Sequence, residues 1–225
     1  MRTIARHGLA QGSPVHFARR MASTKVRESR RFAADPPIRV LFVNDHLGYD
    51  GGCIHGATTY FLTTLTGFDR RTVEPRLCIP RPWHPAAEQF EAHGISPIFL
   101  NRSKWDPTAL FDLIRVIRDH GVDLLHLSGM KGALLGAAAP RLTGRPALLH
   151  LHDVHPLQPG LRALQRRASR EMTKTIVVSE PVREFAVREY GVPPDQIEVV
   201  PNGIRLNSSA RRRRGRANAF AASLV

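Results

Sequence analysis

Short apolar segments alternate with segments of helical spacing through the middle of the chain. The first apolar segment, residues 38–45 (IRVLFVND), has no strict alternation of apolar and polar positions, which is typical of a strand buried on both faces. Similar segments predict further strands at 73–80, 95–100, 123–128, 146–152, 175–179 and 197–200. Helical spacing predicts helices between them, including 57–68, 86–93, 161–172 and 181–190 and a segment ending at 142.

This order of elements predicts the fold class. About seven strand–helix repeats favour an α/β fold with a doubly wound, mostly parallel Rossmann-like sheet and helices on both faces. One helix has specific boundary residues: Asp106 is expected at its N-cap, Pro107 at its first position and Gly121 at its end. We expect the folded domain to span residues 38–206.

The net charge of +14 is concentrated at the two ends of the 225-residue chain. Residues 1–37 carry eight Lys and Arg against two acids, and residues 205–225 carry six Arg and no acid, which leaves only +2 between them. Such ends cannot bury enough apolar area to fold. We therefore expect a basic, disordered extension at 1–37 and a disordered Arg-rich tail at 207–225. An organellar transit peptide is the alternative for the first segment.

Several features bear on location. No apolar run approaches the ~20 residues that cross a bilayer, and no apolar segment follows the early arginines as in a secretory signal. Cys53 and Cys78 lack the CxxC spacing of many metal sites and make only a weak case for a disulfide. We expect a cytoplasmic protein, with peripheral contact to a membrane left open.

Candidate binding residues follow the carboxyl ends of predicted strands, where open parallel sheets bind ligands. Gly51, Gly52 and Gly56 follow the first strand, and glycines there let backbone N–H groups approach an anion such as a diphosphate. The loop does not match GxGxxG, so a dinucleotide fingerprint is absent and a surface loop without a ligand is the alternative. His126 and Lys131 flank the end of a later strand.

A histidine cluster lies at the end of the strand at 146–152. His152 is expected at the mouth of the sheet, where an imidazole can hydrogen-bond a sugar hydroxyl or assist a proton transfer, and Asp153 can orient it or bind substrate. His150 is expected on the same face as His152, with His155 in the loop. A structural role is the alternative for His150. Zinc is the weaker interpretation, because no further ligand follows at helical spacing.

Four stretches together resemble the N-terminal domain of a GT-B glycosyltransferase of the family 4 type. They are residues 40–65 with the glycine loop, 123–132 (DLLHLSGMKG), 147–155 (ALLHLHDVH) and 176–204. The last stretch, which runs from IVVSE to IEVVPNGI, is the most specific. The resemblance covers about 38–206. It implies transfer of a sugar from a nucleotide-sugar donor to an acceptor hydroxyl, with no tightly bound cofactor.

The resemblance also implies roles for individual residues. His152 matches the family's histidine that lines the reacting sugar, and it is the expected catalytic residue. In the family this domain chiefly holds the acceptor, while its glycine loop faces the donor diphosphate. The loop here contains GGCIHG instead of a shorter Gly-Gly-Ala run, which shifts the register of its glycines. The expected substrate-binding residues are Gly51, Gly52, Gly56, His126, Lys131, Asp153, Asn202 and Gly203, and no metal ligand is expected.

The sequence after Ile204 departs from the family pattern. The family's second domain supplies basic residues for the diphosphate and two glutamates separated by seven residues, and no glutamates here have that spacing. Donor binding in such a fold depends on two domains that close together. We therefore expect the chain alone to be weak or inactive, with the second domain lost or supplied by a separate chain.

Two other functions stay open at this point. A non-enzymatic basic protein would contact nucleic acid or an acidic surface through its Arg-rich ends by counterion release. Few aromatic residues are interleaved with those arginines, so nucleic acid is a less favoured partner than a sugar acceptor and a nucleotide sugar. A complete small nucleotide-using enzyme is also less favoured, because neither GxGxxG nor GxxxxGK[ST] occurs.

Overall fold

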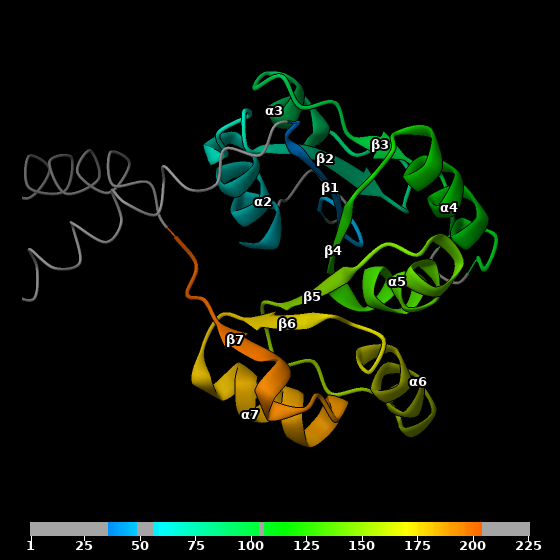
Figure 1. The fold of residues 1–225 in the computed structure, drawn as a ribbon, viewed down its shortest axis with the longest axis vertical. Helices are drawn as coiled ribbons and strands as arrows, with labels where there is room; N and C mark the ends of the chain where they lie inside the picture. Colours follow the sequence, from blue (N-terminus) through cyan, green and yellow to red (C-terminus); the bar gives the residue numbers. More distant parts are fainter. Residues whose placement is uncertain (1–35, 49–55, 104–105, 204–225) are drawn as a thin grey trace, which may run out of the picture.

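The computed structural model describes residues 36–48, 56–103 and 106–203, and within them seven parallel strands form one sheet. The strand order β3-β2-β1-β4-β5-β6-β7 runs from the top to the bottom of Figure 1. The strands are β1 (Ile38–Val43), β2 (Val73–Ile79), β3 (Ile98–Phe99), β4 (Leu124–Ser128), β5 (Ala147–Leu151), β6 (Lys174–Val177) and β7 (Ile197–Val199). The helices are α2 (Gly56–Gly67), α3 (Ala87–Glu91), α4 (Ala109–Asp119), α5 (Gly129–Thr143), α6 (Pro159–Ser169) and α7 (Glu180–Tyr190). The predicted fold class is confirmed.

The order of the strands reverses at β1, which pairs with β2 on one side and with β4 on the other. Val40 of β1, for example, stands opposite Pro75 of β2 and Leu124 of β4. In open α/β sheets the loops diverge at such a reversal and leave a crevice at the carboxyl ends of the strands. This point of the sheet is therefore where a ligand site is expected.

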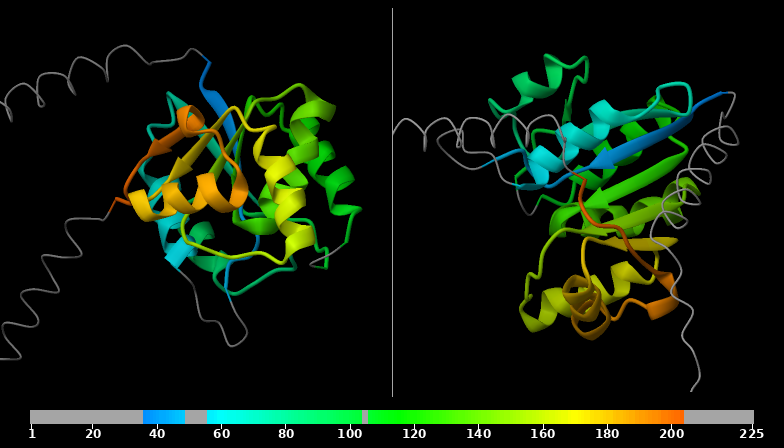
Figure 2. Two further views of the ribbon diagram at one scale, coloured as in Figure 1. Left: turned by 90° about the horizontal axis from the view of Figure 1, so that it is seen from below. Right: turned by 90° about the vertical axis from the view of Figure 1, so that its left-hand side faces the viewer.

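Helices cover both faces of the sheet (Figures 1 and 2), and alternate residues of β1 enter different cores. Phe42 belongs to the core that contains Phe61 of α2 and Phe90 of α3. Leu41 belongs to the core on the other face, with Leu113 of α4 and residues of α5 and α7. Because both faces of β1 are buried, every inner position is apolar and the polar alternation of a half-exposed strand is missing.

The predicted start of α4 is wrong, although its predicted end is confirmed. Asp106 Oδ1 accepts hydrogen bonds from the backbone N–H (2.9 Å) and the hydroxyl (2.6 Å) of Thr108. Asp106 thus makes the side-chain hydrogen bond typical of an N-cap, but the α-helix begins at Ala109, with Thr108 as the N-cap residue. Gly121 has φ +54°, and the N–H groups of Gly121 and Val122 donate back to the last turn, as in a Schellman motif.

The predicted strand at 95–100 is also too long. β3 contains only Ile98 and Phe99 and pairs with β2 alone, at the edge of the sheet. Ile95 is buried in the core beside α3 instead, and its N–H donates to the carbonyl of Phe90. Its apolar side chain therefore packs against the end of a helix. A short apolar segment in the sequence does not show whether its residues form a strand or pack in this way.

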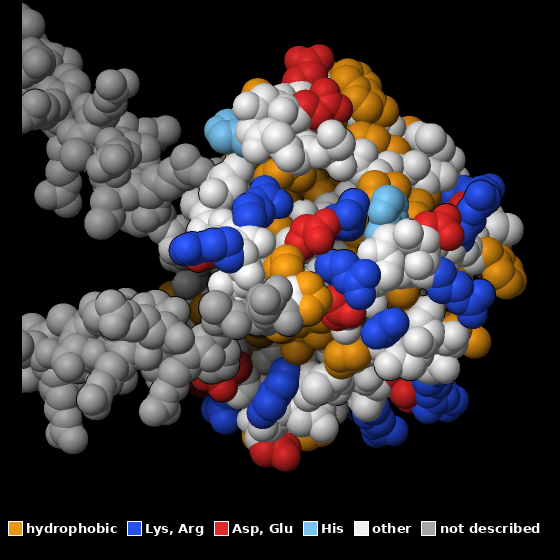
Figure 3. Space-filling view, turned by 45° about the horizontal axis from the view of Figure 1, so that its top comes forward, with side chains coloured by type: hydrophobic (Ala, Val, Ile, Leu, Met, Phe, Trp, Pro, Cys, Tyr) orange, Lys and Arg blue, Asp and Glu red, His pale blue; other side chains and the backbone are white. Residues whose placement is uncertain are grey.

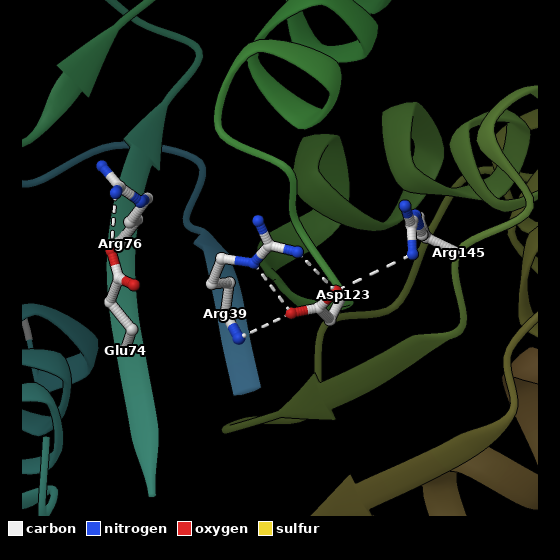
Figure 4. Close-up of polar contacts among 5 residues, drawn as sticks. All are labelled: Arg39, Glu74, Arg76, Asp123 and Arg145. Atoms are coloured by element: carbon white, nitrogen blue, oxygen red, sulfur yellow. Dashed lines mark hydrogen bonds and ion pairs between the residues drawn. The ribbon is translucent and has the colours of Figure 1, made fainter. Parts of the chain in front are cut away.

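An ion-pair cluster ties the strands together at their amino ends, away from the crevice (Figure 4). Arg39 of β1 donates three hydrogen bonds of 3.0 Å to the carboxylate of Asp123, one from its backbone and two from its guanidinium. Arg145 Nη1 lies 3.8 Å from the same carboxylate. These donors, Arg39 above all, lower the pKa of Asp123. The cluster fixes the start of β4 beside β1.

Charge on the described surface is of both signs. Figure 3 shows blue and red side chains interspersed over one face of the molecule. Arginine–carboxylate pairs such as Arg102–Asp112 (2.6 Å) and Arg162–Glu189 (3.0 Å) account for part of this mixing. The two basic ends, 1–37 and 207–225, lie almost wholly outside the described residues, so their predicted disorder and the domain limits stay predictions.

Candidate functional site

A cavity of about 600 Å³ opens at the carboxyl ends of β1, β4 and β5. Asn44 and Asp45 line it from the loop after β1, and Ser128 lines it from the end of β4. His150 and His152 line it from β5 and the residue that follows. The cavity thus lies where the strand order reverses, the position at which open α/β sheets bind their ligands.

Three histidines form a row that runs from the cavity wall into the core: His152 and His150 line the cavity, and His126 lies behind them. His126 Nε2 and His150 Nδ1 are 3.0 Å apart, so one of the two nitrogens donates a hydrogen bond to the other. The rings of His150 and His152 are stacked, with their centroids 4.1 Å apart. The predicted common face of His150 and His152 is therefore confirmed, and it follows from the two-residue period of a strand.

Burial keeps the inner two histidines neutral. Removal from water, followed by the charge of His152, lowers the pKa of His126 to about 3. The same two causes, with a smaller contribution from His126, lower the pKa of His150 to about 2. At neutral pH both rings therefore act as hydrogen-bonding groups without a charge, and His152 packs on a neutral ring.

Aromatic residues hold the histidine row in place from the side of β1 and α2. The ring of Phe42 stacks on that of His126 with the centroids 4.5 Å apart. Tyr60 of α2 contacts both His150, at 5.0 Å between centroids, and His152, at 4.6 Å. Burial raises the pKa of the Tyr60 phenol, so it stays neutral. The outer two imidazoles are thus fixed between a strand and a helix.

The loop after β1 approaches the start of α5 closely at the cavity. Asn44 Nδ2 donates to the carbonyl of His46 (2.8 Å), which shapes this loop. Gly129, the first residue of α5, has φ +73°, and a Cβ there would lie only 3.0 Å from Cβ of Asp45. Glycine is needed for both reasons. Gly129 and Ala133 line the cavity, so the amino end of this 15-residue helix lies beside it.

Helices α6 and α7 close the opposite wall. The hydroxyl of Tyr190, the last residue of α7, donates to the carbonyl of His155 (2.9 Å) and anchors the loop after β5. Its burial, and then the charge of Asp153, raise the pKa of Tyr190 to about 12. Gln165 of α6 is buried and also lines the cavity. Side chains from two helices beyond β5 therefore contribute to the site.

The predicted site residues are only partly brought together. His152, Asp153, Gly56 and Asn202 line the cavity, whereas Gly203 is exposed and does not line it. His126 is buried behind the cavity wall, in contact with His150. Lys131 lies in the first turn of α5, and its side chain is outside what the structure describes. Gly51 and Gly52 lie outside the described residues, so their role stays a prediction.

Three lining or supporting residues were missed by sequence reasoning. Tyr60, Gln165 and Tyr190 all lie in predicted helices, where an aromatic or amide side chain carries no signal of its own. Among the described residues, no group of three His, Cys, Asp or Glu has the geometry of a metal site. Cys78 is a buried free thiol whose pKa burial raises to about 12, and Cys53 lies outside the described residues.

Comparison with known proteins shows to which family the chain belongs. The family model of Glycosyltransferase Family 4 matches residues 54–208, which is well over half of the chain. The chain belongs to glycosyltransferase family 4. A curated relative of this family 4 domain is the UDP-Gal:alpha-D-GlcNAc-diphosphoundecaprenol alpha-1,3-galactosyltransferase of Escherichia coli. It is 26% identical over 113 residues, which are 47% of this chain and 29% of the relative.

Solved structures share the fold of the family 4 domain. The Anabaena protein Alr3699/HepE, in complex with UDP, superposes with a TM-score of 0.60 at 19% identity, over 79% of this chain and 50% of that one. A glycosyltransferase from Rickettsia africae superposes with a TM-score of 0.60 at 16% identity, over 75% of this chain and 44% of that one. This chain thus matches about half the length of these structures. The predicted GT-B type of Rossmann-like sheet is confirmed.

Proposed function

We propose that this domain holds the acceptor during transfer of a sugar from a nucleotide-sugar donor to an acceptor hydroxyl, with His152 beside the reacting sugar. The observation that carries the proposal is the place of His152. It directly follows β5, lines the cavity at the reversal of strand order and is held by His150 and Tyr60. An imidazole fixed in this way can hydrogen-bond a sugar hydroxyl or assist a proton transfer.

The proposed donor is a uridine diphosphate sugar. The Anabaena protein was solved with UDP-glucose and with UDP and glucose, and the Escherichia coli relative is named for UDP-Gal. In our proposal the donor is a co-substrate, and no cofactor is bound tightly. The loop with Gly51, Gly52 and Gly56 approaches its diphosphate, since glycines and a following helix N-terminus favour an anion.

The proposed acceptor is a sugar whose hydroxyl groups contact the polar lining of the cavity. The Escherichia coli relative acts on a lipid-linked N-acetylglucosamine, according to its name. Asp153 and Asn202 line the cavity here, and carboxylate and amide groups suit sugar hydroxyls because they accept or donate several hydrogen bonds. His126 supports the site through His150, and Lys131 and Gly203 complete the proposed substrate-binding set.

The donor half of the reaction is proposed to come from a second domain. Transfer in a two-domain fold requires closure around the substrates, so the domain by itself is expected to be weak or inactive. A separate chain is one source of that domain. In the described part of the chain no helix is both long and apolar enough to cross a membrane. A cytoplasmic location, with peripheral membrane contact, stays a prediction.

The test measures sugar transfer by the full chain mixed with the donor-binding domain of the Escherichia coli relative. UDP sugars serve as donors and a short-chain N-acetylglucosaminyl diphosphate as acceptor. We expect His152→Ala to lower turnover by about 10²–10⁴-fold, the usual effect of losing a positioned acid or base. His155→Ala is the matched control, because His155 lines the same cavity but lies in the loop, and we expect less than about a threefold change. Unchanged turnover in His152→Ala would sink the proposal.

A further inference from the structure

The loop after β5 presents cavity side chains from an exposed, irregular segment. It runs from His152 to Gln158, between β5 and α6, and it contains neither helix nor strand. Asp153 and His155 line the cavity from this loop, and both residues are exposed. A side chain on such a loop loses conformational freedom when it binds a ligand, unless the loop is already held in place.

A single side chain from another element holds the middle of this loop. The hydroxyl of Tyr190, at the end of α7, donates to the backbone carbonyl of His155 at 2.9 Å. Within the described part of the chain, this is the one hydrogen bond that joins residues 153–157 to the rest of the domain. Leu157 also packs against the core, but next to the start of α6. The Tyr190 hydroxyl therefore controls the part of the loop that carries Asp153.

Tyr190 is itself fixed by its surroundings. It is only 6% exposed, and its ring meets that of Phe185 edge-on, with the centroids 5.0 Å apart. Arg166 of α6 holds the end of α7, since its guanidinium donates to the carbonyls of Glu189 (3.0 Å) and Arg188 (2.7 Å). The hydroxyl thus provides a rigid point of attachment, as a preorganised binding site requires.

The contact with His155 brings the Tyr190 hydroxyl close to Asp153 without occupying its carboxylate. Burial, and then the charge of Asp153, raise the pKa of Tyr190 to about 12, so the phenol keeps its proton at neutral pH. A hydroxyl has one proton to donate, and here the carbonyl of His155 accepts it. The carboxylate oxygens of Asp153 therefore stay available to accept hydrogen bonds from a ligand.

The position of this hydrogen bond distinguishes it from one that only satisfies a hydroxyl inside the fold. Thr143, for example, donates from its hydroxyl to the carbonyl of Ala139 (2.7 Å) within its own helix, and it does not line the cavity. The Tyr190 bond instead joins a buried side chain to an exposed loop, and both partners line the cavity. Its loss should therefore be felt at the cavity.

We propose that Tyr190 is a positioning residue, whose hydroxyl holds Asp153 in place for the acceptor sugar through the backbone carbonyl of His155. This inference rests on the proposed function, since it takes the acceptor to be a sugar that Asp153 binds. Tyr190 acts through the loop and needs no contact with the sugar. The loop is ordered before the sugar arrives, so that binding loses less conformational entropy.

The test measures binding of methyl N-acetyl-α-D-glucosaminide to the full chain by NMR titration. We expect Tyr190→Phe to bind the sugar about 10-fold more weakly than the wild type, the usual worth of one hydrogen bond. The backbone amide signals of residues 153–157 should shift in this variant before any sugar is added. Thr143→Val is the matched control, because it also removes a hydroxyl-to-carbonyl bond, and it should bind like the wild type.

A double-mutant cycle with Asp153 distinguishes positioning from a general structural effect. Asp153→Ala should also weaken binding by about 10-fold, because the sugar loses a hydrogen-bond acceptor. In the double variant, Tyr190→Phe should add less than about a twofold further loss, since the hydroxyl acts through Asp153. A double variant that binds about 100-fold more weakly than the wild type would show two independent effects and overturn the inference.

The remaining outcomes separate this inference from the proposed function. If the wild type binds the sugar and Tyr190→Phe binds it equally well, the positioning role is wrong and the proposed function stands. If the wild type does not bind the sugar, both fail. Arg166→Met is a second variant in case Tyr190→Phe does not fold. It releases the end of α7 and should weaken binding by about threefold, and a folded Arg166→Met with wild-type affinity would contradict the inference.

Discussion

His126 and His150, which are 24 residues apart in the sequence, meet through a buried contact of 3.0 Å between Nε2 and Nδ1. The contact joins β4 to β5 beside the strand at which the sheet order reverses. His150 in turn stacks against His152, the residue proposed to act on the sugar. His152 thus packs against a neutral, hydrogen-bonded pair of histidines.

This pair predicts a specific loss of stability in mild acid. In the unfolded chain both histidines have a pKa near 6.5, whereas burial lowers it to about 3 for His126 and about 2 for His150. The stability is therefore fully present above about pH 6.5 and is lost as the pH falls toward the folded values, because only the unfolded chain takes up the protons. Each histidine should contribute a slope of up to about 1.4 kcal/mol per pH unit.

Urea unfolding between pH 7.5 and pH 5.5 measures this slope, above most of the range in which carboxylates titrate. His126→Phe keeps an aromatic ring beside Phe42 but removes one titrating group, and it should show about half the slope of the wild type. An identical slope in the two proteins would show that His126 is not a buried neutral histidine.

Glycine at position 121 is predicted to protect the ion pair at the amino ends of the strands. Gly121 has φ +54°, and a Cβ there would clash with the guanidinium of Arg39. Gly144 has φ +68° with no described atom within 4 Å of such a Cβ. Gly144→Ala should therefore lower the free energy of unfolding only by the cost of the left-handed conformation, about 1 kcal/mol. Gly121→Ala should lower the free energy of unfolding by more than this, because Arg39 must move away from Asp123.

The difference in the free energy of unfolding between Gly121→Ala and Gly144→Ala is measured by thermal or urea unfolding at low salt. In an Asp123→Asn background it should shrink, because Arg39 no longer has a charged partner to lose. A difference that persists unchanged in that background would assign the extra loss to something other than the Arg39–Asp123 pair.

Tyr60 is predicted to support the histidine row through its ring and not through its hydroxyl. Tyr60→Ala removes ring contacts with His150 and His152 and should destabilise the domain by about 2 kcal/mol, less than for a fully buried aromatic. Tyr60→Phe keeps these contacts and should change the stability by less than about 1 kcal/mol. The ring-proton NMR signals of His152 should shift in Tyr60→Ala alone. Equal destabilisation by both variants would instead assign the role to the hydroxyl.

Several features of the fold were predictable from the sequence because they depend on local periodicity. A strand covered on both faces must be apolar at nearly every position, and residues 38–45 show this pattern. Two histidines separated by one residue share a face of a strand, which is why His150 and His152 lie together. Gly121 ends α4 because a left-handed conformation at that position favours glycine.

Other features depend on contacts between distant segments, and only the tertiary structure decided them. Helix α4 begins at Ala109 and not at Pro107, although Asp106 accepts a hydrogen bond from the N–H of Thr108, and local propensity does not fix such a boundary. Gln165 and Tyr190 lie in helices that resemble any other surface helix in sequence, and they reach the cavity only because α6 and α7 pack beyond β5. No spacing of residues in the sequence identifies Gln165 and Tyr190 as cavity residues.

The strand pattern, the parallel direction of the strands and the residues after each strand were thus determined by the sequence itself, since side-chain periodicity and right-handed crossovers are local rules. The neutrality of His126 and His150, and the burial of Gln165 in the cavity wall, were decided by tertiary structure. Both depend on removal from water and on the register between β4 and β5, which places Ser128 opposite His150. Burial is a property of the assembled fold, and a lone histidine or glutamine in a sequence does not reveal it.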